Sequence, residues 1–224
     1  MQRQAIEGFL SSLDKDKKEA YRTYMGELVP QTDEAVFRRF LFAFASVQTR
    51  WQENVALYQA LYDLEWCNDQ KELRRRIQDV YTGLANNRER YIWDLSNHFW
   101  DINGPEWYRR HCDETWTDYR DRMVENIFGL GPAKVSFAIE MIYPDAAEVV
   151  CLDRHMLRMY KHPKDYCSAT QYRQYEDHWV QHSLKSDVNP AVSRWMCWDR
   201  IQDQPDSRYW AYILEPGAAL ATPA

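Results

Sequence analysis

The stretch NIFGLGPAKVSFAIEMIYPDAAEVVCLDRHMLRMYK, residues 126–161, decides the fold. It opens with FGLGP at 128–132, which predicts a tight turn between two helices, because glycine accepts a positive φ and lets the backbone approach another surface. Pro132 suits the first turn of the following helix, where its missing N–H costs nothing. That helix, 133–142, therefore begins with free N–H groups beside Gly129 and Gly131, an arrangement that favours phosphate binding. An ordinary helix–helix turn has the same pattern and is the alternative.

The second part of this stretch is an apolar run, VVCL at 149–152, that ends in Asp153. Such an acid is partly withdrawn from water and can act as a base or stabilise a positive charge. The alternative is that Asp153 only caps the helix that follows it. The window around it is basic, which favours binding of a phosphate or pyrophosphate, although a solvated helix end has the same composition. Its cationic residues are Arg154, His155, Arg158, Lys161, His162 and Lys164.

Composition indicates an all-α protein. The chain has 224 residues, 45% of them hydrophobic, and only seven glycines among long helical patterns,. The net charge of −6 gives no global sign of a nucleic-acid-binding protein, so a local basic patch has to carry any such function,. Five scattered cysteines suggest neither a disulfide framework nor a cysteine-rich metal site, and no signal peptide or membrane span is recognisable,. We therefore expect a cytoplasmic protein without membrane contact.

Periodicity and breaker residues predict a succession of helices. Thr32 or Asp33 is expected to cap the strongly apolar helix EAVFRRFLFAFASV,. The other helices are expected at 1–29 (one or two), 51–66, two within 71–100 joined at 83–87, 107–112, 116–128, 133–142, 155–160 and 171–184, before an aromatic stretch at 189–210.

Four of these segments, in this order, resemble the helix-hairpin-helix DNA glycosylase superfamily. FLFAFASVQTRWQENVALYQAL resembles its early helix pair, with the Ser-x-Gln-x loop at 46–49, and GLANNRERYIWDL resembles its Gly-Leu-x-x-x-Lys-Ala helix start. FGLGPAKVSFAI resembles the hairpin Pro-Gly-Val-Gly-x-Lys-Thr-Ala, and VVCLDRHMLRM resembles Val-Asp-Thr-His-x-x-Arg. The resemblance covers about residues 35–162 and places Asp153 where that superfamily keeps its essential aspartate.

The resemblance implies an all-α, helix-hairpin-helix DNA-glycosylase-like fold of two helical lobes with a cleft between them. We expect one domain at 1–215, with the hairpin at 126–142 and the catalytic aspartate segment at 149–160, followed by a disordered tail at 216–224.

Two departures from the superfamily's pattern bear on the reaction. Lyase-type members keep a Schiff-base lysine two residues after the second hairpin glycine, where this chain has Ala133. Lys134 lies about 100° further round the helix, so lyase chemistry through it is not expected. The C-terminal cysteine cluster of iron–sulfur members is also absent.

The departures and the Trp-rich ending look like the bacteriophage thymidine-hypermodification branch, the amino acid:DNA transferases once called α-glutamyl/putrescinyl thymine pyrophosphorylases. Such an enzyme would flip a 5-pyrophosphoryloxymethyl-uracil from duplex DNA and exchange pyrophosphate for an amine or amino acid such as glycine. Asp153 would deprotonate the incoming ammonium. The alternatives are a monofunctional DNA glycosylase, in which Asp153 supports attack at C1′, and a non-enzymatic DNA-binding module.

The predicted site is assembled around Asp153 as the catalytic residue. Gln48 is expected to enter the DNA stack in place of a flipped base, with a turn or capping role as the alternative, and the aromatic residues near the C-terminus are as readily core. We expect DNA contacts from Gly129, Gly131, Lys134, Gln48, Arg154 and Arg158, and substrate contacts from His155, Trp198 and Arg208. Neither metal ligands nor a cofactor is predicted, except that the resemblance allows a monovalent cation on the hairpin carbonyls.

Overall fold

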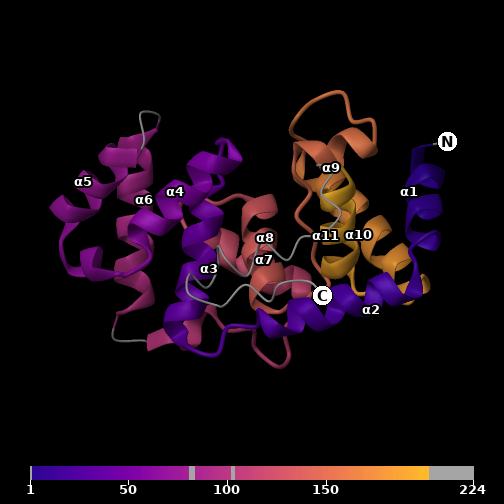
Figure 1. Cartoon of the computed structure of the whole chain (residues 1–224), viewed down its shortest axis with the longest axis horizontal. Coiled ribbons are helices and arrows are strands. Elements are labelled where there is room, and N and C mark those ends of the chain that lie inside the picture. Colours follow the sequence, from indigo (N-terminus) through magenta and orange to yellow (C-terminus); the bar gives the residue numbers. More distant parts are fainter. Residues whose placement is uncertain (1, 81–83, 102–103, 202–224) are drawn as a thin grey trace, which may run out of the picture. The chain divides into compact units, whose positions relative to one another are not determined.

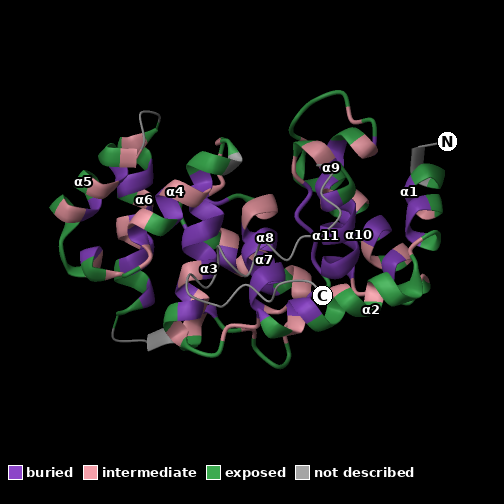
Figure 2. Ribbon diagram, viewed as in Figure 1, coloured by how far each residue is buried: buried purple, intermediate pink, exposed green. Residues whose placement is uncertain are grey.

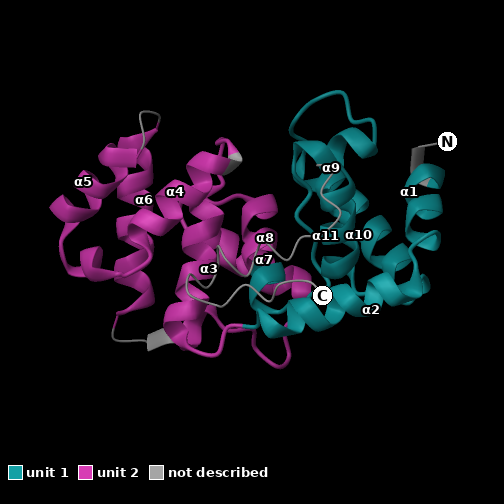
Figure 3. Ribbon diagram, viewed as in Figure 1, with its two compact units in different colours: residues 1–29, 139–224 teal, residues 30–138 magenta. Residues whose placement is uncertain are grey.

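The computed structural model describes residues 2–80, 84–101 and 104–201, and within them every regular element is a helix (Figure 1). The chain divides into two compact units. Unit 1 comprises residues 1–29 and 139–224, and unit 2 comprises residues 30–138 (Figure 3). The predicted tail at 216–224 lies outside the described residues. No helix in the described part is long and apolar enough to cross a membrane.

Unit 1 is built on two aromatic helices near the C-terminus that carry its core. Trp179 of α10 and Trp195 of α11 are fully buried, and the ring of Phe9 from α1 lies 6.2 Å from that of Trp179. The indole N–H of Trp179 donates to Ser193 Oγ at 2.9 Å, which satisfies the polar edge of the buried ring,. The helices of unit 1 are α1 (Gln2–Ser11), α2 (Lys15–Glu27), α9 (Arg154–Met159), α10 (Ala169–Lys185) and α11 (Pro190–Ile201), together with the end of α8 (Pro132–Ile142).

Unit 2 is organised around the phenylalanine-rich helix α3, which is buried along most of its length (Figure 2). It begins at Asp33, because the hydroxyl of Thr32 accepts from the N–H of Ala35, as the sequence predicted,. Helices α4, α5 and α6 pack in succession beside it. The helices of unit 2 are α3 (Asp33–Ala45), α4 (Trp51–Leu61), α5 (Gln70–Val80), α6 (Ala85–Phe99) and α7 (Trp116–Asn126), two 3₁₀ turns, η1 (Glu65–Asn68) and η2 (Gly104–Tyr108), and the start of α8.

The predicted helix at 107–112 is wrong. The structure has only η2, which ends at Tyr108, and the chain beyond it is irregular. Side chains take the carbonyls that a helix would use: Tyr119 donates to the carbonyl of Tyr108, and Arg122 donates to those of Trp107 and Arg109. Tertiary contacts thus override the local helical pattern.

The helix expected at 51–66 is shorter than predicted. It ends at Leu61, because Leu64 takes a left-handed conformation with φ of 64° and the chain continues as η1. The indole N–H of Trp66 then donates to the carbonyl of Leu61, which caps the end of α4 from beyond the break,.

Candidate active site

Asp153 sits at the N-cap of α9 with one carboxylate oxygen engaged. Its Oδ1 accepts from the N–H groups of His155 at 2.9 Å and Met156 at 3.1 Å. The other oxygen, Oδ2, bonds to no group in the described part of the chain. The residue is half-buried. The N-cap role and a catalytic role of Asp153 are therefore compatible, because Oδ1 fixes the side chain and Oδ2 can still accept a proton or face a positive charge.

The backbone that leads into Asp153 belongs to no helix, and three consecutive N–H groups in it bond to buried side chains. The N–H of Val150 donates to Glu176 Oε1 at 2.9 Å, and that of Cys151 to Glu140 Oε1 at 2.8 Å. The N–H of Leu152 donates to the hydroxyl of Tyr172 at 3.3 Å, and this hydroxyl donates back to the carbonyl of Val150 at 2.7 Å. A segment outside any helix has to satisfy its buried amides in this way. Asp153 is thus held by the end of α8 and by α10.

Glu140, which binds the N–H of Cys151, forms a fully buried ion pair with Arg194 of α11. The guanidinium donates through Nε to Oε1 at 3.2 Å and through a second nitrogen to Oε2, and Trp195 adds a bond from its indole at 3.3 Å. Burial raises the pKa of Glu140, while the charge of Arg194 opposes this. Its four hydrogen bonds all come from donors, the pattern of an ionised acceptor,.

Arg194 also responds to the charge of Asp153. Burial lowers the pKa of this guanidinium, but Glu140, and to a smaller degree Asp153, more than reverse the effect and raise it. A permanent positive charge therefore lies behind the candidate catalytic carboxylate, inside the core of unit 1.

Two of the three predicted substrate-contacting residues lie together beside Asp153. The rings of His155 and Trp198 meet edge to face, with centroids 5.1 Å apart, and both residues are half-buried. The third, Arg208, lies outside the described residues.

The two arginines predicted to bind DNA on α9 differ. Arg154 is exposed and bonds to no residue that the structure describes, so it is available to an anion. Arg158 is also exposed but pairs with Asp165 at 3.2 Å. The predicted basic window is thus partly neutralised within the loop that follows α9.

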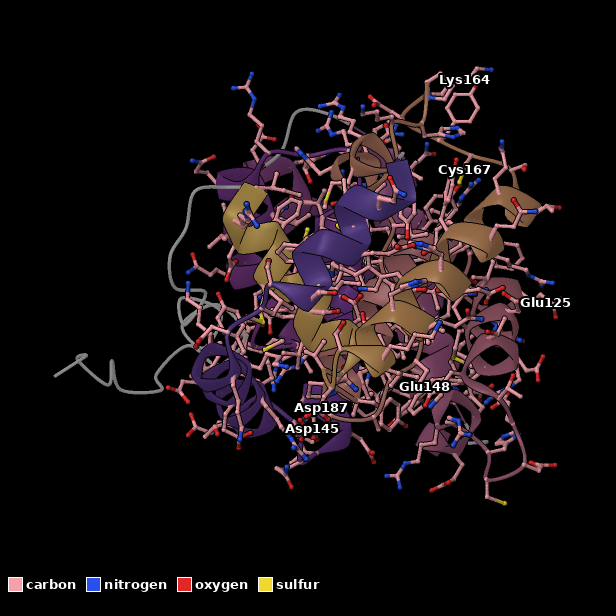
Figure 4. The ribbon with its side chains drawn as sticks, turned by 90° about the vertical axis from the view of Figure 1, so that its right-hand side faces the viewer. Glu125, Asp145, Glu148, Lys164, Cys167 and Asp187 are labelled. Atoms are coloured by element: carbon pink, nitrogen blue, oxygen red, sulfur yellow. The ribbon has the colours of Figure 1, made fainter. Side chains whose placement is uncertain are left out.

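This loop, between α9 and α10, forms a hollow of about 470 Å³ lined by residues 162–164, 166–168 and 171. Lys164 and Cys167 mark it in Figure 4. Burial raises the pKa of the Cys167 thiol, so nothing there activates it as a nucleophile,. Asp153 does not line this hollow, and we assign it no part in the candidate site.

In unit 2, the predicted hairpin joins α7 to α8 and depends on one of its two glycines for its shape. Gly129 has φ of 92°, and a Cβ added to it would lie 2.4 Å from a ring carbon of Tyr91. Gly131 does not have a positive φ, and nothing lies within 4 Å of an added Cβ. Gly129 therefore lets the turn pack against α6, and Gly131 leaves an open surface.

The open side of the hairpin carries free donors. The N–H groups of Gly131 and Ala133 bond to no atom within the described ranges, and the exposed ring of Phe128 stands beside them at 65% exposure. An anion can therefore approach the backbone here, at the positive end of α8. Lys134 does not project freely, because its ammonium donates to Ser46 Oγ at 2.9 Å.

The contact of Lys134 with Ser46 brings the loop of Gln48 to the hairpin. Gln48 is exposed at the tip, with φ of 52°. The buried Arg88 of α6 holds the loop by donating to the carbonyls of Phe44, at 2.7 Å, and of Val47. The predicted DNA-contacting residues of unit 2 thus lie on the hairpin and the 46–50 loop, which contact each other and are both held by α6.

The fold is the all-helical, helix-hairpin-helix fold of DNA glycosylases, as the sequence predicted. Neither a family profile nor a curated protein sequence matches the chain.

Solved structures give this assignment. The chain is similar to the 8-oxoguanine DNA glycosylase of Methanocaldococcus jannaschii, with 16% identity, a TM-score of 0.70, and coverage of 90% of this chain and 94% of that one. It is similar to the 8-oxoguanine glycosylase/lyase of the same organism in complex with a 15mer DNA containing 8-oxoguanine, with 17% identity, a TM-score of 0.71, and coverage of 90% and 97%. The 8-oxoguanine DNA glycosylase of Thermotoga maritima gives 15% identity, a TM-score of 0.70, and coverage of 92% and 100%.

Sequence patterns did not single out the residues that hold Asp153 in place, namely Glu140, Arg194, Glu176 and Tyr172. A signal was present for the first two, since each is a charged residue inside an apolar helical run, FAIEMIY and VSRWMCW. A charge in such a run has to find a partner when it is buried. The partner itself could not be identified, because the two residues are 54 positions apart.

Proposed function

We propose that this chain is an enzyme acting on a base turned out of duplex DNA, and that Asp153 carries the reaction. The observation that supports this most directly is the mounting of Asp153, with one oxygen fixed by the start of α9 and the other left free. A carboxylate held in this way is pre-organised and loses little freedom when it meets a developing charge. The three similar structures, all DNA glycosylases by their descriptions, support an action on DNA.

The reaction that we propose first is hydrolytic base excision. The bond between C1′ of deoxyribose and the base nitrogen breaks as the pair of electrons leaves with the base, and positive charge develops on the sugar. Asp153 would stabilise this charge and take a proton from the water that adds to C1′. The departing base takes up this proton at the nitrogen that left the sugar, and the products are the free base and an abasic site.

Strand cleavage is not expected to accompany excision. The position that carries the Schiff-base lysine in lyase-type members is Ala133, and the neighbouring Lys134 is engaged with Ser46. A lysine that donates its ammonium to a hydroxyl on another loop is not poised as a free amine nucleophile.

Contact with DNA is assigned to unit 2. The free N–H groups of Gly131 and Ala133 suit a phosphodiester oxygen, and such backbone contacts position a duplex without reading its sequence. Gln48, exposed on its loop, would fill the gap left by the everted base,.

A second candidate is the transferase reaction that the sequence resemblance implies. The free oxygen of Asp153 would equally deprotonate an incoming ammonium, and the unpartnered Arg154 next to it suits a departing pyrophosphate,. The amine nitrogen would bond to the 5-methylene carbon of the activated uracil as the bond to pyrophosphate oxygen breaks. The N-glycosidic bond stays intact in this reaction, which separates it from excision.

One experiment distinguishes these reactions. Labelled duplexes that contain 8-oxoguanine, uracil or 5-pyrophosphoryloxymethyl-uracil are incubated with the protein, the last of them with glycine, and the products are resolved by mass spectrometry and by hot-alkali cleavage. Excision gives strands that break only in alkali, while transfer gives an alkali-stable strand that is lighter than the substrate, because glycine replaces the heavier pyrophosphate. Asp153→Asn is expected to slow either reaction by about 100-fold or more.

The matched control is Asp187→Asn. Asp187 is an exposed residue of the same unit with φ of 54°, a conformation that asparagine accepts equally well (Figure 4),. The activity of the Asp187→Asn variant should equal that of the wild type. Binding of the duplexes without any product, and unchanged in Asp153→Asn, would instead indicate a DNA-binding module and overturn the proposal.

A further inference from the structure

Three side chains of unit 1, away from the candidate active site, direct their ligand atoms toward one another. Glu7 belongs to α1, and His178 and His182 belong to successive turns of α10. Oε1 of Glu7 lies 3.2 Å from Nε2 of His178 and 3.4 Å from Nε2 of His182. All three ligand atoms lie within 4.8 Å of one another. The spacing of the two histidines, four residues apart on one helix, is the one that lets both imidazoles reach the same ion.

The hydrogen bonds of the outer ring nitrogens fix which nitrogen carries the proton. Nδ1 of His182 lies 2.9 Å from the carbonyl oxygen of His178, which can only accept, so this nitrogen is the N–H,. Nδ1 of His178 lies 3.1 Å from the hydroxyl of Tyr160. That hydroxyl donates its own proton to the carbonyl of Tyr175 at 2.9 Å, so it accepts from the imidazole. In both neutral rings, the lone pair is therefore on Nε2 and faces Glu7.

Two imidazole lone pairs and a carboxylate oxygen that face one another are three acceptors, and a shared cation attracts all three,. A proton on one ring serves only one of the two contacts with Glu7, and a proton on each ring places two positive charges on rings whose centroids are 4.4 Å apart. One of these rings, that of His178, has a side chain only 5% exposed. Adjacent like charges with little access to water repel strongly. A single metal ion satisfies all three ligand atoms at once.

The geometry suits a tetrahedral ion. Bonds of about 2.0–2.1 Å to zinc place neighbouring ligand atoms about 3.3 Å apart at the corners of a tetrahedron. The two distances from Glu7 match this edge. Outer-nitrogen hydrogen bonds to a carbonyl and a hydroxyl are also the support that metal-bound histidines usually have. Glu7 is 39% and His182 25% exposed, so a water can complete the coordination from the solvent side.

We propose that Glu7, His178 and His182 bind a divalent transition-metal ion, with Zn²⁺ as the candidate, and that the ion fastens α1 to α10. The helix α1 is short, and its most extensive contacts within unit 1 are with α9 and α10. The ion also bears on the candidate active site, because Tyr160, which supports His178, is the C-cap residue of the helix that Asp153 begins. Its role is to stabilise unit 1, and it takes no part in the reaction.

Zn²⁺ titration of the full-length, metal-stripped protein tests this. We expect one ion per chain with a Kd of about 1 μM or below, and a Tm rise of about 5–10 °C at a hundredfold excess over the Kd. Co²⁺ should give the intense visible absorption of a four-coordinate ion. In His182→Gln and Glu7→Gln, the affinity should fall at least about tenfold, and the Co²⁺ bands should disappear.

The matched control is His98→Gln. His98 is an exposed histidine of unit 2 whose ring lies 3.6 Å from the carboxylate of Asp94, and it belongs to no three-residue cluster among the described residues. It should retain wild-type affinity and spectrum. The proposal is overturned if Zn²⁺ leaves the Tm of the wild type unchanged, if His182→Gln binds as tightly as the wild type, or if His98→Gln loses binding to the same extent.

Discussion

Removal of the positive charge behind Asp153 is the most informative perturbation of unit 1. Arg194→Met leaves Glu140, which is fully buried, without its partner. Breaking a buried pair from one side costs about 3–5 kcal/mol, because an uncompensated charge remains in the core. Glu140→Gln should cost a similar amount, since it leaves the guanidinium of Arg194 buried opposite a neutral amide.

The double variant Glu140→Gln/Arg194→Met contains no buried charge at this place, and the glutamine oxygen can still accept from the N–H of Cys151. It should therefore lose only about 1–2 kcal/mol, far less than the sum of the single changes. The coupling energy of the cycle is then several kcal/mol, which is the signature of a dedicated pair.

Urea unfolding followed by tryptophan fluorescence and circular dichroism measures these differences. Hydrogen exchange locates them: Arg194→Met should weaken protection in peptides of 139–201 and leave α3 and α4 as they are. Arg158→Met, which breaks the exposed pair with Asp165, is the control and should change stability by less than about 0.5 kcal/mol,. A cost below about 1 kcal/mol for Arg194→Met, or additive single changes, would refute the reasoning.

Four further predictions concern single residues. Gly129→Ala should destabilise unit 2 by about 2–4 kcal/mol in urea unfolding, because Gly129 has a positive φ and an added Cβ would collide with the ring of Tyr91,. Gly131→Ala should leave the stability unchanged but weaken duplex binding in a filter assay, because an added Cβ meets no atom of the protein within 4 Å. The hydrogen bond from Arg122 holds the pKa of Glu114 below its usual value of 4.5. The stability that this ion pair contributes is therefore present above pH 4.5 and is lost as the pH falls through the lower folded-state pKa,. Glu114→Gln should remove that part of the acid dependence of the free energy of unfolding. Asp153→Ser should keep the N-cap and the Tm while it abolishes turnover, and a retained rate would exclude the carboxylate. Gln48→Ala should slow single-turnover reaction with little change in Tm, because the side chain is exposed,.

Local chemistry explains which parts of the fold could be predicted from the sequence. The start of α3 follows from the hydroxyl of Thr32 and the apolar run behind it, and the hairpin follows from two glycines and Pro132. The segment at 107–112 could not be assigned correctly, because Tyr119 and Arg122, both further along the chain, compete for its carbonyls. Hydrophobic periodicity within a short stretch of sequence does not reveal partners that lie further along the chain.

In the candidate site, too, local features could be predicted from the sequence, and features that depend on distant residues could not. The position of Asp153 at the start of α9 could be predicted, because the end of an apolar run before a helix is a local property. The engagement of only one of its two carboxylate oxygens within the described residues could not be predicted, since this depends on where the N–H groups of α9 lie. Likewise, Lys134 was expected to contact DNA, and its bond to Ser46 depends on a loop 88 positions away.

The buried network also explains why a carboxylate can be presented from an apolar wall at all. A non-helical segment within a helical core has amides that no helix satisfies, and each unsatisfied buried amide costs about 1–3 kcal/mol. Here Glu140 and Glu176 supply the acceptors, and the charge of Glu140 in turn requires Arg194. The buried residues Glu140, Glu176 and Arg194 therefore serve one requirement, which is to satisfy the backbone immediately before Asp153. A purely apolar core would allow this segment to coil, and the carboxylate would lose the fixed orientation on which the proposed chemistry depends.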